Sequence, residues 1–417
     1  MKLLNIRNSE VLSFDGKGSR LWRSGSLSRF IYLNREDVEL SWIISNFDHY
    51  NKVSRPYLSS KVINDEPYYK ALEMLPTCGY SRNLSFMRIV DHISFSMKLF
   101  WTVLARHRDT DIFFCSFPTV ESCFVTLILS RIVGAKFIVD IRDRWPDVFF
   151  EKFTSFSLLF KLLFIPYFII RYFTFRYADS IVATNEDFKR WAQDLSGRPL
   201  GKRLDDAVFP IGFSDPLKGD CEDFSTNILK KYNATDDDYI ISFGGTLGEM
   251  FDFSLVKIGL EELDSAGVKY KFFIFGDGEA FESVRSSFLD NSSVHFMGRV
   301  NSNELFSFYT ISNLLVAPYF PLSNFINHIP NKISEYLAAG KPIVTSLSGV
   351  AGKLLEKHSC GYIYETSSEF ADAVRKCIEL GTFEMGEKSR ELFLSRFQLD
   401  NINSDIVKHC IAINGKH

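Results

Sequence analysis

The chain has 417 residues, of which 46% are hydrophobic, so its length and composition favour two or more domains with cores of their own. A formal net charge of −3 and the lack of a Lys/Arg-rich run argue against a nucleic-acid-binding protein, so any nucleotide is expected to be a small ligand. Seven scattered cysteines, without a Cys-x-x-Cys pair or a Cys/His cluster at zinc spacing, argue against a structural zinc site and are typical of the reducing cytoplasm.

The first half of the chain alternates apolar strand candidates with helix-length segments. Charged residues follow the first candidate too soon for a secretory signal, so we expect a cytoplasmic protein. Repeated strand–helix–strand order predicts a parallel sheet covered by helices on both faces. The strand candidates are residues 3–6, 38–45, 112–116, 137–141, 180–183 and 208–211, and helical patterns such as residues 19–33 and 120–132 separate them.

Residues 153–175 form an apolar run rich in phenylalanine that is nearly long enough to span a bilayer. Lys161 and Pro166 interrupt the run, and Arg171 and Arg176 punctuate or border it, as in a helix that lies in a membrane interface. Strand candidates of one predicted sheet precede and follow the run, which argues against a membrane span. A membrane-surface helix and a buried helix both remain open.

Acidic residues accumulate over residues 215–238, where large aliphatic residues are few, and we predict the domain linker there. The second half then repeats the plan of the first, so we predict two doubly wound α/β domains. They cover residues 1–214 and 239–397, followed by a C-terminal helix over residues 398–417 that could pack back on the N-terminal domain. The strand candidates of the second half are residues 239–243, 271–275, 294–297, 314–317, 343–345 and 361–364.

Four turns rich in glycine or charge follow strand candidates, which is where ligands bind in doubly wound sheets. They cover residues 16–20, 142–147, 244–248 and 276–279. Glycine allows the backbone to approach a ligand closely, although one such turn alone is more often a tight connection between strand and helix. None of the four is a Gly-x-Gly-x-x-Gly fingerprint or a phosphate loop that ends in Gly-Lys-Ser/Thr.

Residues 330–340 predict a helix with one face that packs and one that is offered to a ligand. Asn331, Lys332 and Glu335 share the polar side, and Gly340 is expected to end the helix. The positive end of the helix dipole beside Lys332 suits a diphosphate, and Glu335 can accept two hydrogen bonds from the vicinal hydroxyls of a ribose. An ordinary amphipathic helix with solvated charges is the alternative.

Taken in order, these segments resemble the GT-B-fold glycosyltransferases of the large retaining family 4, and in particular the bacterial surface-polysaccharide branch that includes O-antigen N-acetylfucosaminyltransferases. The resemblance runs from near Met1 to past Phe397. It implies two Rossmann-like domains that face a cleft. The motifs that carry it are Gly16-x-Gly18-Ser19-Arg20-Leu21-Trp22-Arg23 followed by Ser45-Asn46-Phe47-Asp48-His49, Asp140-x-Arg142-Asp143-x-Trp145-Pro146, Gly245-Thr246-Leu247-Gly248-x-x-x-Asp252, Gly276-Asp277-Gly278, Phe296-x-Gly298 and Pro330-Asn331-Lys332-x-x-Glu335-Tyr336-Leu337-Ala338-Ala339-Gly340-Lys341-Pro342.

The resemblance also implies a donor site in the second domain. The family usually has two glutamates separated by seven residues; Glu335 matches the second, which binds the ribose, whereas Asn327 stands at the first. The family's usual diphosphate-binding Arg and Lys are missing, so we expect Lys332 to take their place, with Arg299 and Arg142 as further candidates. The remaining expected donor contacts are Asn331, Gly245, Thr246 and Gly276.

In the first domain, Gly16, Gly18 and Arg20 are expected to form a loop at the acceptor and the cleft. Asp143 could orient or deprotonate the acceptor hydroxyl, and a salt bridge to Arg142 or Arg144 is the alternative reading of the same carboxylate. Asp143, Arg142 and Lys332 are therefore the candidate catalytic residues.

The implied function is transfer of a sugar from a nucleotide diphosphate sugar to a glycan acceptor, without a metal ion or other cofactor. Asn327 in place of a carboxylate predicts an N-acetylated or deoxygenated sugar, such as a UDP-linked N-acetylated deoxyhexosamine. We expect an undecaprenyl-linked acceptor, a place on the inner face of a bacterial plasma membrane, and a role in O-antigen, capsule or exopolysaccharide synthesis. A nucleotide-sugar epimerase and a non-catalytic sugar-nucleotide-binding subunit are the alternatives.

Overall fold

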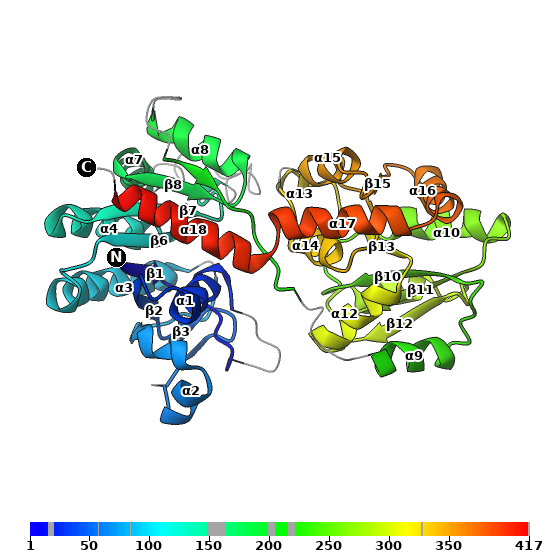
Figure 1. Ribbon diagram of the computed structural model, residues 1–417, viewed down its shortest axis with the longest axis horizontal. Helices are drawn as coiled ribbons and strands as arrows, with labels where there is room; N and C mark the ends of the chain where they lie inside the picture. Colours follow the sequence, from blue (N-terminus) through cyan, green and yellow to red (C-terminus); the bar gives the residue numbers. More distant parts are fainter. Residues whose placement is uncertain are drawn as a thin grey trace. The chain divides into compact units, whose positions relative to one another are not determined.

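The computed structural model describes residues 1–15, 21–56, 58–83, 85–147, 164–198, 205–215, 222–326 and 328–415. The chain divides into two compact units (Figure 1), which we call the N-terminal unit (Met1–Pro210 with Asp400–His417) and the C-terminal unit (Ile211–Leu399). Each is a Rossmann-like α/β domain built on one parallel sheet. The predicted fold class of two doubly wound domains is therefore confirmed.

The N-terminal unit contains a parallel sheet of seven strands in the order β5-β2-β1-β6-β7-β8-β9. Each strand candidate of the first half corresponds to one of these strands, and the edge strand β5 is the one that the sequence pattern missed. A separate antiparallel pair joins β3 (Phe47–Asp48) to β4 (Val53–Ser54). The strands of the sheet are β1 (Lys2–Arg7), β2 (Glu39–Ser45), β5 (Leu72–Leu75), β6 (Ile112–Phe117), β7 (Lys136–Ile141), β8 (Ser180–Ala183) and β9 (Ala207–Val208).

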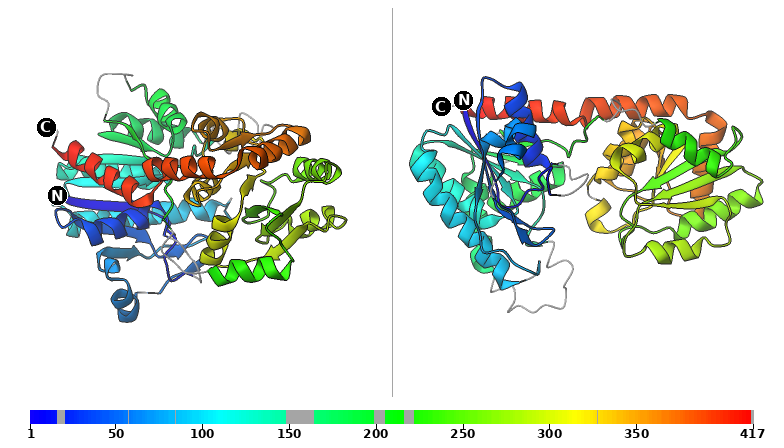
Figure 2. Two further views of the ribbon diagram at one scale, coloured as in Figure 1. Left: turned by 45° about the vertical axis from the view of Figure 1, so that its right-hand side comes forward. Right: turned by 90° about the horizontal axis from the view of Figure 1, so that it is seen from below.

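Helices cover both faces of this sheet (Figure 2). On one face α3, α4 and α7 bury residues such as Phe95, Cys123 and Phe175 against the strands. On the other face α1 and α18 bury Leu27 and Ile406. The helices are α1 (Arg23–Asn34), α2 (Ser60–Asp65), α3 (Phe86–Arg106), α4 (Val120–Val133), α7 (Ile165–Tyr177), α8 (Glu186–Ser196) and α18 (Leu399–Asn414), with a 3-10 turn over Pro67–Ala71.

The last helix, α18, belongs to the N-terminal unit although it follows the whole C-terminal unit in the sequence. Its apolar face is buried against the sheet, and Asn403 Nδ2 donates a hydrogen bond to Ser26 Oγ at 3.0 Å. The chain therefore passes between the units twice, next to Pro210 and next to Leu399.

The C-terminal unit contains a parallel sheet of six strands in the order β12-β11-β10-β13-β14-β15. These strands are β10 (Tyr239–Gly244), β11 (Tyr270–Phe275), β12 (Val294–Gly298), β13 (Leu314–Ala317), β14 (Ile343–Thr345) and β15 (Gly361–Ile363), and all six were predicted. The helices are α9 (Glu222–Lys231), α10 (Ser254–Ser265), α11 (Phe281–Ser287), α12 (Ser302–Ile311), α13 (Ser323–Ile326), α14 (Asn331–Ala338), α15 (Val350–Lys357), α16 (Ser367–Leu380) and α17 (Phe383–Arg396).

The range expected to be a linker, residues 215–238, contains helix α9. Ile228 on this helix is buried in a cluster with Ile240 of β10 and Phe273 of β11, so α9 is an integral layer of the C-terminal unit. The acidic composition of the range concealed a helix whose few apolar residues share one side. The two units divide earlier, after Pro210.

Only part of the aromatic run over residues 153–175 lies within the described residues. Its second half forms α7, which turns Thr174 and Phe175 inward and leaves Ile169, Tyr172 and Phe173 exposed. Among the described helices, none has the length and apolar character needed to cross a bilayer.

The strand order places a topological switch point in each sheet. In the C-terminal unit, β10 lies between β11 and β13, and the chain leaves β10 on one side and returns on the other. In the N-terminal unit, β1 lies between β2 and β6 in the same way. Ligands of doubly wound sheets bind beyond the carboxyl ends of the strands at such points.

Candidate functional site

The helix predicted over residues 330–340 is α14, and it lies at the switch point of the C-terminal sheet. Ile333, Tyr336 and Leu337 are fully buried on its packed side, whereas Lys332 and Glu335 keep partial exposure on the other. Gly340 follows the helix with φ +66°, a left-handed conformation that glycine adopts without strain. Pro330 stands at the N-cap of the helix and provides no side-chain cap.

Tyr336 holds α14 against the central strands. Its hydroxyl donates a hydrogen bond to the Val316 carbonyl of β13 at 3.2 Å and accepts one from the Gly244 N–H of β10 at 3.4 Å. The Tyr309 hydroxyl donates to the Gly244 carbonyl at 3.2 Å. These buried bonds fix the height and rotation of α14, and hence the positions of Lys332 and Glu335.

The ammonium group of Lys332 lies over the end of β10. Its Nζ donates a hydrogen bond to the Gly244 carbonyl and lies 5.6 Å and 5.4 Å from the ring centres of Phe243 and Tyr336. Glu335 Oε2 is 3.6 Å from the same Nζ, and the two side chains are only 11% and 17% exposed. A cation and a carboxylate are thus held one helical turn apart at the carboxyl edge of the sheet.

Two glycine turns beside Lys332 are in direct backbone contact. Gly276 has φ +122°, and a Cβ atom there would lie 1.8 Å from the Gly245 carbonyl oxygen. The Gly245 N–H donates to the Phe275 carbonyl at 2.9 Å, and a Cβ on Gly245 would lie 2.8 Å from Lys332 Cε. Neither position accommodates a side chain without rearrangement, because each turn closes against the next element.

A hollow of about 310 Å³ opens beside these turns. Four residues of the predicted donor set line it, since Gly245 and Thr246 follow β10, Gly276 follows β11 and Arg299 follows β12. Lys332 adjoins the hollow through Gly245, Glu335 lies 3.6 Å from the Lys332 ammonium group, and Asn331 is exposed at the start of α14. The other lining residues are Phe275, Asp277, Val300 and Leu305.

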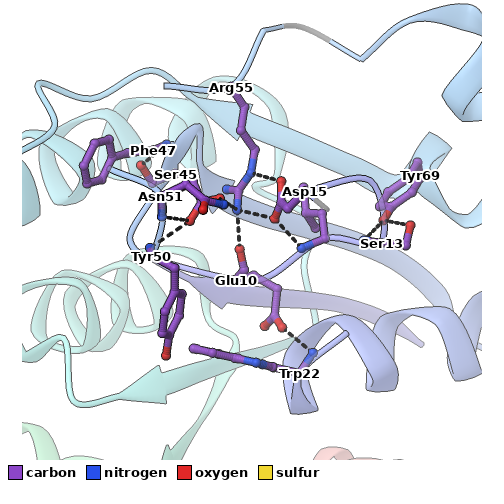
Figure 3. Close-up of polar contacts among 12 residues, drawn as sticks. Glu10, Ser13, Asp15, Trp22, Ser45, Phe47, Tyr50, Asn51, Arg55 and Tyr69 are labelled. Carbon is purple, nitrogen blue, oxygen red and sulfur yellow. Dashed lines mark hydrogen bonds and ion pairs between the residues drawn. The ribbon is translucent and has the colours of Figure 1, made fainter. Parts of the chain in front are cut away.

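Four predicted site residues lie outside the described residues: Asn327 of the donor set and Gly16, Gly18 and Arg20 of the expected acceptor loop. The described segments on either side of that loop are firmly anchored (Figure 3). Asp15 accepts hydrogen bonds from Arg55 Nε and Nη2, both at 2.7 Å, and Glu10 Oε1 accepts one from the Trp22 N–H at 2.7 Å.

A second hollow, of about 270 Å³, lies at the carboxyl ends of the strands in the N-terminal unit. The predicted residues Arg142 and Asp143, which follow β7, line it together with Arg7 of β1 and Ser116 of β6. Three of the aromatic residues that line it, Trp22, Phe47 and His49, lie in segments that carry the resemblance. The others were not singled out from the sequence, because they lie on separate elements that only the fold brings together: Tyr50, Tyr80, His92 and Phe117.

Arg142 is engaged within the N-terminal unit itself. Its Nε donates to Asp140 Oδ2 at 2.7 Å and its Nη2 donates to Ser116 Oγ at 2.9 Å. Burial alone would raise the pKa of Asp140, but the charges of Arg23 and Arg142 outweigh burial and lower it. Arg142 pairs with the more deeply buried Asp140, and the alternative reading of Asp143, a salt bridge to Arg142 or Arg144, stays a prediction.

Asp143 lines the hollow, and its pKa is shifted in the opposite direction from that of Asp140. Burial raises its pKa above the ordinary value, although a backbone hydrogen bond and the positive charges of Arg144 and Arg88 oppose the shift. A carboxylate whose charge is destabilised in this way is a better proton acceptor than an ordinary surface aspartate. Asp143 is thus the more suitable acid–base group of the two candidates in this unit.

Within the described ranges, no group of three or more His, Cys, Asp and Glu side chains is arranged to hold a metal ion. The charged groups near the C-terminal hollow are Lys332, Glu335, Arg299 and Asp277. The arrangement can hold a polyanion through cations, backbone N–H groups and the helix end, and a polar ligand through Glu335.

Residues 246–379 match the family model described as Glycosyl transferases group 1. The matched segment runs from the turn after β10 to α16 of the C-terminal unit. This match includes Thr246, Gly276, Arg299, Lys332 and Glu335. A search of curated protein sequences found no significant match.

Solved structures match the chain over nearly its whole length. The HepE protein of Anabaena, in complex with UDP, is 16% identical, with 99% of this chain and 100% of that chain covered and a TM-score of 0.65. A glycosyltransferase of Rickettsia africae is 15% identical, with coverages of 100% and 99% and a TM-score of 0.64. The UDP-GlcNAc 2-epimerase of Neisseria meningitidis, bound to UDP-GlcNAc, is 11% identical, with coverages of 99% and 100% and a TM-score of 0.56. At these identities the matches establish the GT-B fold.

Proposed function

We propose that the protein is a retaining glycosyltransferase that moves a sugar from a nucleotide diphosphate sugar to a hydroxyl group of a glycan. The observation that carries this proposal is the site in the segment that matches the Glycosyl transferases group 1 model. There, α14 presents Lys332 and Glu335 beside a hollow lined by Gly245, Gly276 and Arg299.

In this proposal the C-terminal hollow takes the nucleotide part of the donor. The N–H groups at the start of α14, the Gly245 turn, Lys332 and Arg299 bind the diphosphate, and Glu335 accepts hydrogen bonds from the ribose hydroxyls. UDP is the first nucleotide to test, because HepE with the same fold was solved in complex with UDP.

The reaction breaks the bond between the anomeric carbon and the diphosphate oxygen and forms a bond from that carbon to the acceptor oxygen. Negative charge grows on the leaving diphosphate, so stabilising it is the main catalytic demand. Lys332, Arg299 and the helix end meet this demand without a metal ion. Asp143 orients the acceptor hydroxyl and accepts its proton.

We further propose an N-acetylated or deoxygenated sugar donor and a lipid-linked glycan acceptor of a bacterial surface polysaccharide. Asn327, at the position of the family's sugar-contacting glutamate, supports this donor class because an amide can both donate and accept hydrogen bonds. Asn327→Glu should shift relative activity towards fully hydroxylated hexose donors, as measured over a panel of UDP-sugars. Equal activity ratios in the variant and the unaltered protein would show that Asn327 does not select the sugar.

The deciding experiment is product analysis with UDP-sugars in the presence and absence of a glycan acceptor. A transferase releases nucleoside diphosphate in step with acceptor glycosylation, whereas an epimerase changes the donor without acceptor and a binding subunit does neither. The epimerase is the second candidate because the Neisseria meningitidis enzyme shares the fold. Altered donor in the absence of acceptor would overturn the transferase proposal.

A thermal-shift screen identifies the donor before any acceptor is known. A ligand present at 100 times its Kd stabilises the folded protein by about 2.7 kcal/mol. The effective nucleotide should stabilise the unaltered protein more than the Glu335→Gln variant, because the carboxylate that binds the ribose is absent from the variant.

A further inference from the structure

Helices α3, α4 and α7 lie side by side over one face of the sheet in the N-terminal unit (Figures 1 and 2). Their inward residues form the core with the strands, whereas their outward surfaces carry large apolar side chains. We define the docking face by six of these: Ile93, Met97 and Trp101 of α3, Ile132 of α4, and Ile169 and Phe173 of α7.

The exposed apolar side chains of the docking face follow the repeat of the helices that carry them. Ile93, Met97 and Trp101 succeed one another every four residues, so they project from one side of α3, and Met97 and Trp101 are 54% and 64% exposed. Ile132 and Ile169 on the two neighbouring helices are 56% and 51% exposed. Single exposed apolar residues need no explanation, but an aligned set on three adjacent helices marks an interaction surface.

The charges on these three helices favour an anionic partner. The helices carry six basic side chains and two acidic ones, Asp91 and Glu121. Both acids point inward, since Asp91 accepts a hydrogen bond from the Gly79 N–H at 2.7 Å and Glu121 accepts one from the Tyr167 hydroxyl at 2.5 Å. The basic residues are Arg88, Lys98, Arg106, Arg131, Arg171 and Arg176, of which Arg171 is buried.

Two of the exposed cations have acidic neighbours from flanking segments. Arg106 pairs with Glu73 and Arg131 pairs with Asp179. The carboxylate side chains of Glu73 and Asp179 are 25% and 20% exposed. Lys98 and Arg176 donate to main-chain carbonyls. The exposed charge on the helices themselves is therefore positive throughout, and it borders an apolar surface.

We propose that the docking face binds the surface of an anionic phospholipid bilayer, with α3, α4 and α7 lying parallel to it. Apolar side chains between helical cations enter the headgroup region, and Lys and Arg pair with lipid phosphates. Aromatic side chains such as Trp101 prefer this interface. A second copy of the chain fits less well, because a two-fold contact would bring the same cations together.

The docking face also leads towards the hollow of the N-terminal unit. Phe86 and Met87, at the start of α3, are exposed, and the next residue, Arg88, lines the hollow. The Arg88 guanidinium lies 5.9 Å from the ring centre of Tyr80 and 5.7 Å from that of Trp145. This arrangement places the hollow next to the bilayer, where a lipid-linked acceptor would be found; that link, unlike the docking itself, rests on the proposed function.

Vesicle flotation of the full chain tests the proposal. The unaltered protein should float with vesicles of phosphatidylcholine and phosphatidylglycerol, and much less with vesicles of phosphatidylcholine alone. Ile93→Ser, Met97→Ser and Trp101→Ser in one variant should weaken binding by roughly tenfold or more, because a tenfold change needs the loss of only about two buried CH₂ groups. Raising the salt concentration should weaken binding further.

The matched control carries three apolar residues of the C-terminal unit, each more exposed than the three of α3, changed to serine: Leu289, Leu380 and Phe383, which are 75%, 73% and 82% exposed. This control should bind vesicles as the unaltered protein does. Unchanged flotation of the α3 variant, equal loss in the control, or no flotation of the unaltered protein would overturn the proposal.

Two further measurements separate the alternatives. Sedimentation that shows a dimer of the unaltered protein and a monomer of the α3 variant, without vesicle binding by either, would assign the face to self-association and overturn the proposal. UDP binding reports on the folding of each variant and on the donor site separately. Vesicle binding by a protein that transfers no sugar would keep the docking proposal and reject the proposed function.

Discussion

Replacement of Glu335 by glutamine tests the donor site with the smallest change of shape. Glu335 lies one turn into α14, with Oε2 3.6 Å from Lys332 Nζ and the side chain 17% exposed. A charge-assisted hydrogen bond of this kind is worth about 1.5–3 kcal/mol. Glu335→Gln should therefore raise the Kd for UDP by roughly ten- to 150-fold, because the amide accepts hydrogen bonds more weakly than the carboxylate.

The assay is titration calorimetry with UDP and with 2′-deoxy-UDP. If Glu335 binds the ribose, removing the 2′-hydroxyl and changing the carboxylate eliminate the same interaction. The two penalties should then fall well short of additivity in a double-mutant cycle. This result would assign the contact to the ribose, and a purely structural effect of the substitution would not produce it.

The matched control is Glu384→Gln on α17. Glu384 also pairs with a lysine on its own helix, at 2.7 Å from Lys388 Nζ, but its side chain is 81% exposed and distant in sequence from the hollow. UDP affinity should stay unchanged in this control. Unchanged affinity in Glu335→Gln, or strictly additive penalties in the cycle, would refute the assignment of Glu335 to the ribose.

Three further predictions concern the two hollows. Asp143→Asn should lower kcat by roughly 10²- to 10⁴-fold. Because burial raises the pKa of Asp143, its ionisation destabilises the folded protein as pH rises through that pKa. The variant should therefore melt at a higher temperature than the unaltered protein at neutral pH, and this difference should disappear in acid. Gly276→Ala should lower the free energy of unfolding in urea by about 1–3 kcal/mol or more, since the residue has φ +122° and its Cβ would lie 1.8 Å from Gly245 O. The control Gly267→Ala, at φ +73° with open space around it, should lower the free energy of unfolding by less. The pKa of His49 is lowered from 6.5 to about 4 by burial and then by the positive charges of Lys52, Arg88 and His92. The folded protein should therefore lose stability as pH drops from 6.5 towards 4, and His49→Gln should remove that part of the pH dependence. An NMR titration of His49 with a midpoint near 6.5 would contradict this.

Periodicity along the chain predicted the strands of both parallel sheets except β5. The buried strands β6, β7, β10 and β11 are mostly apolar, because helices cover both of their faces. The edge strand β5 escaped notice, since three of its four residues are only partly buried and its pattern is weak. Helix α9 was missed for a related reason, because its acidic surroundings outweighed the few apolar residues that it buries.

The sequence by itself also determined the polar face of α14 and the glycine turns after β10 and β11, because helical spacing and backbone freedom are local properties. Only the tertiary structure decided which side chains meet. It brought Lys332 over Gly244, paired Arg142 with Asp140, and gathered aromatic residues from separate loops around the hollow that Asp143 lines. It likewise aligned the exposed apolar sides of α3, α4 and α7 into one surface. Contacts of this kind depend on strand order and helix packing between residues far apart in the chain, and no spacing within one segment encodes them.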